Sequence, residues 1–417
     1  MARDTLPTLK AIEQMVSARL PWGIEALRRL IAVDSLSPNE KACQETLVDL
    51  LRIEGLPARL VPIDEGDLRA TDGFIDSDLP LGNRPNLVVA IGRGDEGHRS
   101  LILNSHIDVV SWLEGVSGWQ SYPLAGAVRG GKIFGRGAVD AKGQVMTAIL
   151  AILALRDLGY EPGGRLILES VVGEEPDGNG TLALCSQGWL ADAAVVLEPT
   201  DNHIAYGHRG IAGLRLLVKG QAGHAAVLTS SANAILAAGQ LARVLDGALA
   251  GWSAPSDKTY GPPSVNVGRI QGGEGIFTIP ESCTLECGVR YAPGTYDSIL
   301  HHIQTHLSGS DAPIATPTSG IWELSVFSHY DAAEVAPDSP LALELLACMN
   351  QVAPDRRLVT FPGGCDARHF VNRYGVPAVV FGPGQLAVAH GVDEFLSLDQ
   401  WVIAIQALAL FVTRWCG

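Results

Sequence analysis

The chain has 417 residues, 47% of them hydrophobic, which is more than one hydrophobic core usually holds, so we expect two domains. Its 45 acidic and 30 basic side chains give a formal charge of -15, which argues against nucleic acids and membrane surfaces as partners. Seven scattered cysteines without a C-x-x-C pair, and an N-terminus without an apolar signal segment, indicate a cytoplasmic protein with reduced thiols.

The first half of the chain alternates helices with short apolar strands. Two amphipathic helices come first, and Ser37-Pro38-Asn39-Glu40 predicts a capping box at the start of the second helix. Near-continuous apolar strands separated by helices are typical of a parallel sheet that is covered on both faces. We therefore expect an α/β domain with a mostly parallel sheet and helices on both faces. Its predicted helices are 21–32, 40–54, 144–158 and 180–187, and its predicted strands are 87–91, 101–105, 165–172 and 193–197.

From about Tyr206 the order changes to strand, helix, two strands, helix and strand, which indicates an α+β layer with its own small sheet. Alternation then resumes with a helix at 340–352, a strand at 378–381 and a closing helix that Ser397 and Gln400 can cap. The second domain is therefore expected as an insertion, with 1–207 and 327–417 forming one domain and 208–326 the other. The elements predicted inside the insertion are strands at 213–218, 264–271, 281–291 and 321–326 and helices at 231–245 and 296–307.

Side chains of the kinds that bind metals follow the predicted strands of the first domain. His106 and Asp108 come directly after the strand at 101–105, although a His-x-Asp pair alone is common by chance. Ligands gather beyond the carboxyl ends of parallel strands, and charged groups buried there need partners or a metal ion. A set of histidines and carboxylates spread over five strand ends or their loops therefore predicts a metal site. The members of the set are His106, Asp108, Asp140, Glu174, Glu175, Glu198 and His390.

The side-chain types in this set narrow the choice of metal. Two imidazoles with several carboxylates suit zinc, cobalt or manganese, whereas calcium and magnesium favour all-oxygen ligands. Two ions that share one bridging carboxylate, beside a free carboxylate that takes a proton from water, form the arrangement of two-metal hydrolases. Of the adjacent Glu174 and Glu175, only one need bind metal, and the other is then the natural general base.

Five ordered motifs spanning nearly the whole chain resemble those of the co-catalytic zinc aminoacylase and exopeptidase family, which includes acetylornithine deacetylase, succinyl-diaminopimelate desuccinylase and glutamate carboxypeptidase. The motifs are S-H-I-D-V-V, G-R-G-A-V-D-A-K-G, G-E-E-P, E-P-T and A-H-G-V-D-E-F. The resemblance implies two zinc ions, with cobalt or manganese as possible substitutes. It implies that Asp108 orients a metal-binding histidine and that Glu174 is the base and proton shuttle. The implied ligands are His106, Asp140 and Glu198 for one ion, and Asp140, Glu175 and His390 for the other.

The inserted domain is similar to the lid and dimerisation domain of that family, so the resemblance implies a homodimer. His224, in K-G-Q-A-G-H-A-A, would reach across the dimer and stabilise the tetrahedral oxyanion in the neighbouring site. Asn266 and Arg290 lie where relatives bind the carboxylate of the substrate, and arginine suits a carboxylate through its bidentate geometry. Arg368, in G-G-C-D-A-R-H-F, resembles part of another substrate loop.

These residues together predict a two-zinc amidohydrolase that removes the acyl group from an N-acyl amino acid. The metals would polarise the scissile carbonyl and activate water, and Glu174 would pass the proton of the water to the leaving amine. A glutamate at position 198, rather than an aspartate, resembles the deacylases and carboxypeptidases more than the dipeptide-cleaving aminopeptidases. A metallo-carboxypeptidase or ureido-amide hydrolase of the same family is the alternative, and a non-catalytic metal-binding scaffold is a third hypothesis.

Overall fold

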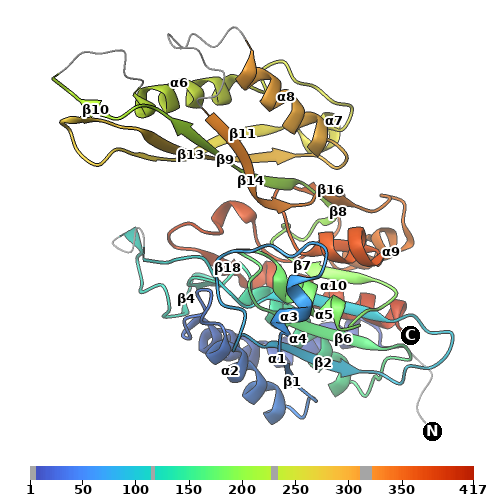
Figure 1. Ribbon diagram of the computed structural model, residues 1–417. Helices are drawn as coiled ribbons and strands as arrows, with labels where there is room; N and C mark the ends of the chain where they lie inside the picture. The colour runs from blue at the N-terminus through green and yellow to red at the C-terminus, as the bar shows by residue number, and fades with distance from the viewer. Residues whose placement is uncertain (1–5, 114–117, 227–232, 310–321) are drawn as a thin grey trace. The chain divides into compact units, whose positions relative to one another are not determined.

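The structure is a computed structural model that describes residues 6–113, 118–226, 233–309 and 322–417. The chain divides into two compact units, each with its own hydrophobic core (Figure 1). One unit contains Met1–Gly207, Glu334–Phe361 and Cys365–Gly417, and the other contains His208–Ala333 and Pro362–Gly364. Among the described helices, none is both long enough and apolar enough to cross a membrane.

The first unit is built on a largely parallel sheet. Its strands are β1 Arg59–Val61, β2 Asn86–Ile91, β3 Leu101–His106, β6 Leu166–Val171, β7 Ala194–Leu197, β8 Ile204–His208, β15 Ala333–Glu334, β16 Leu358–Phe361 and β17 Ala378–Phe381. Their order is β1-β2-β6-β3-β7-β17-β8-β15, and β16 pairs with β8. β3 runs parallel to β6 and β7, and β17 runs parallel to β7, so the carboxyl ends of these four strands lie at one edge. This sheet confirms the predicted fold class.

Helices cover both faces of the sheet. They are α1 Leu9–Ile31, α2 Lys41–Ile53, α4 Lys142–Asp157, α5 Asn179–Ser186, α9 Pro340–Val352 and α10 Leu398–Trp415. Leu101 and Leu103 pack with α1, α2, α4, α9 and α10 on one face, while Ile102 points to the other face, which α5 covers. α4 is buried around nearly its whole length, which explains its continuous apolar sequence. α1 begins well before the predicted start, and Pro21 lies inside it.

A small antiparallel sheet joins two distant segments near the carboxyl edge. Its strands are β4 Ala127–Arg129, β5 Lys132–Phe134 and β18 Phe395–Ser397. Elsewhere in the first unit, the short helix α3 spans Glu65–Arg69. β5 leads into the loop that contains Asp140, and β18 follows the loop that contains His390. The pairing of β5 with β18 therefore brings these two residues close together from opposite halves of the chain.

The second unit is an antiparallel sheet with helices on one face. Its elements are β9 Gly210–Lys219, β10 Gly223–His224, α6 Ala234–Gly247, α7 Asp257–Tyr260, β11 Ser264–Gly272, β12 Thr278–Ile279, β13 Ser282–Tyr291, α8 Tyr296–Ser308 and β14 Trp322–Tyr330. The main sheet has the order β11-β13-β9-β14. Alternate residues such as Leu214 and Leu285 pack against α6 and α8, and the opposite face is partly exposed. The predicted starts at 231 and 321 lie outside the described residues.

Both predicted capping boxes are wrong. Glu40 is the N-cap of α2 but makes no side-chain cap bond, because its carboxylate accepts hydrogen bonds from Arg84. Ser397, the N-cap of α10, also makes no cap bond, and the Gln400 side chain accepts the backbone N–H of Gly384. In each case the side chain bonds to a group that is distant in the sequence, and not to a backbone N–H group at the start of its own helix. A local sequence pattern cannot reveal such a partner.

Candidate metal centre

Histidine and carboxylate side chains meet at the carboxyl edge of the parallel sheet. β3 ends at His106, and the segments after β6 and β7 carry three glutamates. The loop before α4 supplies an aspartate, and the loop before β18 supplies a second histidine. The structure thereby brings together all the predicted metal-site residues of the first unit. They are His106, Asp108, Asp140, Glu174, Glu175, Glu198 and His390.

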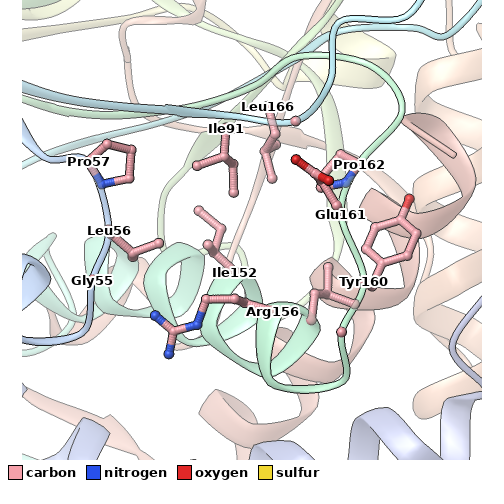
Figure 2. A pocket seen from close by; sticks show the side chains of 13 residues that line it. Gly55, Leu56, Pro57, Ile91, Ile152, Arg156, Tyr160, Glu161, Pro162 and Leu166 are labelled. Carbon is pink, nitrogen blue, oxygen red and sulfur yellow. The ribbon is translucent and has the colours of Figure 1, made fainter. Parts of the chain in front are cut away.

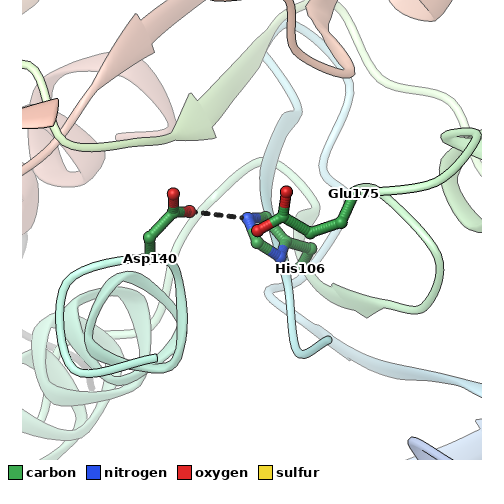
Figure 3. Close-up of side chains that lie close together, drawn as sticks. All are labelled: His106, Asp140 and Glu175. Carbon is green, nitrogen blue, oxygen red and sulfur yellow. Dashed lines mark hydrogen bonds and ion pairs between the residues drawn. The ribbon is translucent and has the colours of Figure 1, made fainter. Parts of the chain in front are cut away.

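Asp140 lies between the two imidazoles. Its Oδ1 is 3.0 Å from His106 Nε2, and its Oδ2 is 3.2 Å from His390 Nε2. His106 Nε2 is also 3.7 Å from Glu198 Oε1, and His390 Nε2 is 3.0 Å from Glu175 Oε1. Figure 3 shows His106, Asp140 and Glu175 pointing toward one another, and one ligand atom from each lies within 4.8 Å of the others. Such a spacing suits metal coordination.

The glutamates of the cluster carry an electrostatic cost. Burial raises the pKa of Glu174 and of Glu198 well above the usual range of a glutamate, and burial also raises the pKa of Glu175. Glu175 and Glu198 also raise the pKa of Glu174, and Glu175 raises that of Glu198, because like charges repel. A bound divalent cation would offset this repulsion, so the donor set fits a metal site.

The two histidines respond to the same carboxylates. Burial opposes the charged form of His106, but hydrogen bonds with Asp108 and Asp140 raise its pKa well above the ordinary value. Hydrogen bonds with Asp140 and Glu175 raise the pKa of His390 to about 10. His106 donates its Nδ1–H to the carbonyl oxygen of Asp108 at 3.1 Å, which leaves Nε2 facing the cluster. A metal ion in this cluster would take the place of a proton on each Nε2.

Asp108 holds the segment that carries the two adjacent glutamates. Its buried carboxylate accepts the backbone N–H of Glu174 through Oδ1 at 3.2 Å and that of Glu175 through Oδ2 at 3.1 Å. The same carboxylate lies 3.5 Å from His106 Nδ1. The sequence reading anticipated only the contact with the histidine, because the hydrogen bonds to Glu174 and Glu175 depend on the folded turn.

Glu394 and Arg136 are buried supporting residues that the sequence reading missed. Glu394 Oε1 accepts the backbone N–H of Val139 at 2.9 Å and of Asp140 at 3.2 Å, and Oε2 accepts Arg136 Nη1 at 2.7 Å. Arg136 also donates to the carbonyl oxygen of His390, which has a left-handed φ of 61°. Burial raises the pKa of Glu394 to about 7. Arg136 lies in the motif G-R-G-A-V-D-A-K-G and Glu394 in A-H-G-V-D-E-F, and this position in the motifs was the signal that could have marked them.

Three predicted site residues belong to the second unit. Asn266 pairs with Gly288 across β11 and β13, and Arg290 lies two residues further along, so both project from the exposed face of the sheet. His224 is exposed in β10, and its Nδ1 accepts the backbone N–H of Ala226 at 3.1 Å, which leaves Nε2–H as a donor. Their approach to the metal cluster stays a prediction.

Arg368 lies inside the first unit with only 1% of its surface exposed. Its guanidinium donates to the carbonyl oxygen of Asp177 at 2.7 Å and to that of Cys365 at 3.4 Å. The predicted contact with substrate stays a prediction. The burial of the guanidinium and its bonds to the backbone favour a supporting role instead.

A pocket lies at the opposite edge of the same sheet and has a different chemistry. Its volume is about 340 Å³, and Ile91 at the end of β2 and Leu166 at the start of β6 line it (Figure 2). Leu56 and Ile152 add further apolar wall, and Glu161 is at its margin. The described residues that line this pocket include no histidine, so it does not share the chemistry of the metal cluster.

A cluster of histidines and carboxylates at the carboxyl edge of a covered α/β sheet defines the class as a metal-dependent hydrolase. The comparison with family models then identifies the family. The chain belongs to peptidase family M20/M25/M40, whose model matches residues 102–414. Members of this family hydrolyse amide bonds, and this chain is therefore an amide-bond hydrolase.

Named relatives support the same family. The chain is 29% identical over 365 residues to N-formyl-4-amino-5-aminomethyl-2-methylpyrimidine deformylase of Bacillus subtilis, covering 80% of this chain and 83% of the relative. It is 27% identical over 351 residues to a probable succinyl-diaminopimelate desuccinylase of Staphylococcus aureus, covering 77% and 83%. The fold matches the metallo-carboxypeptidase Sso-CP2 of Sulfolobus solfataricus with a TM-score of 0.74 at 15% identity, covering 94% and 99%.

Proposed function

We propose that this protein is a two-metal deacylase that removes the acyl group from an N-acyl amine or N-acyl amino acid, with Glu174 as the general base. The observation that carries the proposal is the position of Asp140 between two imidazoles, with one carboxylate oxygen toward each. A carboxylate in this position suits two ions that share it as a bridge.

The donor set divides into two groups around Asp140. Zinc is the metal that the two imidazoles and the carboxylates suit best, with cobalt and manganese as substitutes. When bound, the ions would polarise the amide carbonyl and make a water molecule more acidic. The proposed ligands are His106, Asp140 and Glu198 for one ion, and Asp140, Glu175 and His390 for the other.

Glu174 has the properties of a base for this reaction. Burial raises its pKa well above the usual range of a glutamate, in the direction that makes a carboxylate a better proton acceptor. Its backbone N–H is held by Asp108, beside the ligand Glu175, while its side chain remains partly exposed. We infer that it accepts a proton from water and donates it to the leaving amine.

The substrate would be a small amide. The names of two relatives, a deformylase and a desuccinylase, support removal of an acyl group. Arg290 and Asn266 would bind a substrate carboxylate, because their side chains lie on one exposed sheet face. His224 would donate Nε2–H to the oxyanion, in a homodimer that the second unit would form.

The substitution Glu174→Gln tests the role of the base. The variant should keep both metal ions and lose about 10²-fold to 10⁴-fold of turnover, because the amide cannot accept the proton. Glu161→Gln, which changes an exposed glutamate at the other edge of the sheet, is the matched control and should keep full turnover. Wild-type turnover in a Glu174→Gln protein that holds two metal ions would contradict the proposal.

A substrate series tests the class of bond. N-formyl, N-acetyl and N-succinyl amino acids should be hydrolysed in the presence of zinc, cobalt or manganese. Peptides with a free C-terminal residue should be poorer substrates. Cleavage of the peptides alone would reject the deacylase and favour a metallo-carboxypeptidase.

A further inference from the structure

The turn Gly173–Gly178 carries Glu174 and Glu175 and has a glycine at each end. Gly173 has a φ of 71° and Gly178 a φ of 72°, both in the left-handed region that favours glycine. A Cβ at Gly173 would lie 2.8 Å from Arg84 Nη2, and a Cβ at Gly178 would overlap Arg368 Nη2. Each end of the turn therefore lies directly against a guanidinium group.

Arg84 connects the first end of the turn to the rest of the site. It forms a buried bidentate pair with Glu40, with Nε–Oε2 at 2.9 Å and Nη2–Oε1 at 2.5 Å. Its Nη2 also donates to Ser37 Oγ at 3.4 Å. The Ser37 hydroxyl donates to Glu40 Oε1 at 2.7 Å and lies 3.4 Å from Asp108 Oδ2. Asp108 in turn accepts the backbone N–H of Glu174. Arg84 thus lies against the first end of the turn, and Ser37 packs between the Arg84–Glu40 pair and the carboxylate that binds the turn.

Arg368 holds the second end of the turn. Its Nη2 donates to the carbonyl oxygen of Asp177 at 2.7 Å. The backbone N–H groups of Asp177 and Gly178 both donate to the carbonyl oxygen of Gly173, which closes the turn on itself. The Asp177 carboxylate accepts Ser77 Oγ at 2.6 Å. The turn is therefore fixed by buried side chains from separate parts of the chain.

We propose that Arg84 and Arg368 are positioning residues that clamp the glutamate turn at both ends and set the direction of Glu174. The proposal rests on the proposed function, in which Glu174 is the base. Both guanidinium groups are buried, and the bonds described above join them to other groups of the protein. The planar fork of arginine supplies several donors in a fixed geometry, which the single ammonium group of lysine cannot reproduce. A small displacement of a catalytic group costs a large part of the rate.

The variants Arg84→Lys and Arg368→Lys keep the positive charge and remove the fork. Each should lower kcat by about 10-fold to 100-fold, because the base is displaced, while KM and metal content stay within about 2-fold. The matched control is Arg93→Lys, which changes an exposed arginine paired with Asp95 and should leave kcat unchanged. A raised KM with kcat retained in Arg368→Lys would instead place that residue on the substrate and overturn its role in the clamp.

A milder variant covers the case in which a lysine at position 84 prevents folding. Ser37→Ala removes the hydroxyl that lies between Arg84 and Asp108 and donates to Glu40, and it leaves both charged partners of the buried ion pair in place. It should lower kcat by about 3-fold to 10-fold without changing KM. An unchanged kcat in Ser37→Ala, together with an unchanged kcat in Arg84→Lys or failure of that variant to fold, would overturn the Arg84 half of the proposal.

Combination with Glu174→Gln separates positioning from a general effect on folding. If the arginines act through Glu174, Arg84→Lys and Arg368→Lys should lower the residual kcat of Glu174→Gln by less than about 2-fold. A merely structural role would reduce the active fraction equally in both backgrounds, and such a result would overturn the clamp. Wild-type turnover in Glu174→Gln would reject the proposed base itself. An inactive Glu174→Gln beside fully active lysine variants would reject only the clamp.

Discussion

The two edges of the parallel sheet are made by the same strands and have opposite chemistry. At the carboxyl edge, β3 ends at His106 and a set of buried carboxylates surrounds it. At the other edge, β6 begins at Leu166 in the wall of an apolar pocket. α4 connects them, since it begins just after Asp140 and its last turns line the pocket. Burial stabilises the apolar edge and penalises the acidic one, so only the acidic edge should depend on a bound cation.

Removal of metal should have the largest effect. Dialysis against a chelator should lower kcat by about 10³-fold or more, because the ions supply several kcal/mol of stabilisation to the transition state. Added zinc, cobalt or manganese should restore it. The measurement is turnover of an N-acyl amino acid together with metal content by elemental analysis. Full activity in a metal-free protein would show that the acidic edge does not depend on a bound cation.

Loss of Glu394 should have the next largest effect. Glu394→Gln weakens the bonds that orient the backbone at Asp140 and leaves the buried guanidinium of Arg136 without its negative partner. The affinity for metal should fall by about 10-fold to 100-fold, which is typical when a residue behind a ligand is changed. Competition with a chromogenic chelator measures this affinity, with Glu161→Gln at the apolar edge as the control. Equal metal affinities in Glu394→Gln and Glu161→Gln would contradict the role of Glu394 in supporting the ligand Asp140.

Glu169, inside β6 between the two edges, should make stability depend on pH. Burial, together with the nearby Asp366 and against the opposing effects of Asn104 and Arg165, raises its pKa to about 8. Because this value exceeds that of the unfolded chain, the wild type should lose stability between about pH 4.3 and 8, by up to about 1.4 kcal/mol per pH unit.

Glu169→Gln lacks this titration. The difference in unfolding midpoint between the variant and the wild type should therefore grow in favour of the variant from pH 5 to pH 8. Thermal unfolding in a buffer series measures it. A difference that stays constant across the series would show that Glu169 ionises normally in the folded protein.

Filling the apolar pocket should have the smallest effect. Ile91→Phe adds volume where about 340 Å³ is available, so the stability should rise by about 0.5 kcal/mol to 1 kcal/mol. The kcat should stay within about 2-fold of the wild type, because the pocket is at the edge away from the cluster. Denaturant unfolding and turnover measure the two. A large loss of kcat would connect the edges through α4 and break the contrast between them.

Local patterns were sufficient for elements whose causes are local. The helix Pro340–Val352 has its predicted bounds because Ser339 caps it and proline suits its first turn, and the apolar strand Ala378–Phe381 also matches. The parallel arrangement of the strands explains why the expected ligand types meet at one edge. The metal they bind and the role of each residue stay predictions.

The buried ion pairs that support the site could not be predicted from the sequence, because the two members of each pair lie far apart along the chain. Arg84 binds Glu40, and Arg136 binds Glu394, yet no periodicity connects positions so far apart. Glu40 even gave a misleading signal. Ser37 and Glu40 match the pattern of a capping box, but the Glu40 carboxylate pairs with Arg84 and caps no helix. Buried ion pairs of this kind depend on tertiary structure, whereas caps and apolar runs depend on neighbours.

The insertion of the second unit between Glu198 and His390 has a consequence for synthesis on the ribosome. In the proposed assignment, the ligands His106, Asp140 and Glu198 of one ion all emerge before the inserted unit is made. The ligand set of the other ion lacks His390 until that unit has been translated. All ligands of the first ion are therefore present before the inserted unit is made, but Glu394, which orients Asp140, and β17, which pairs with β7, follow only after that unit.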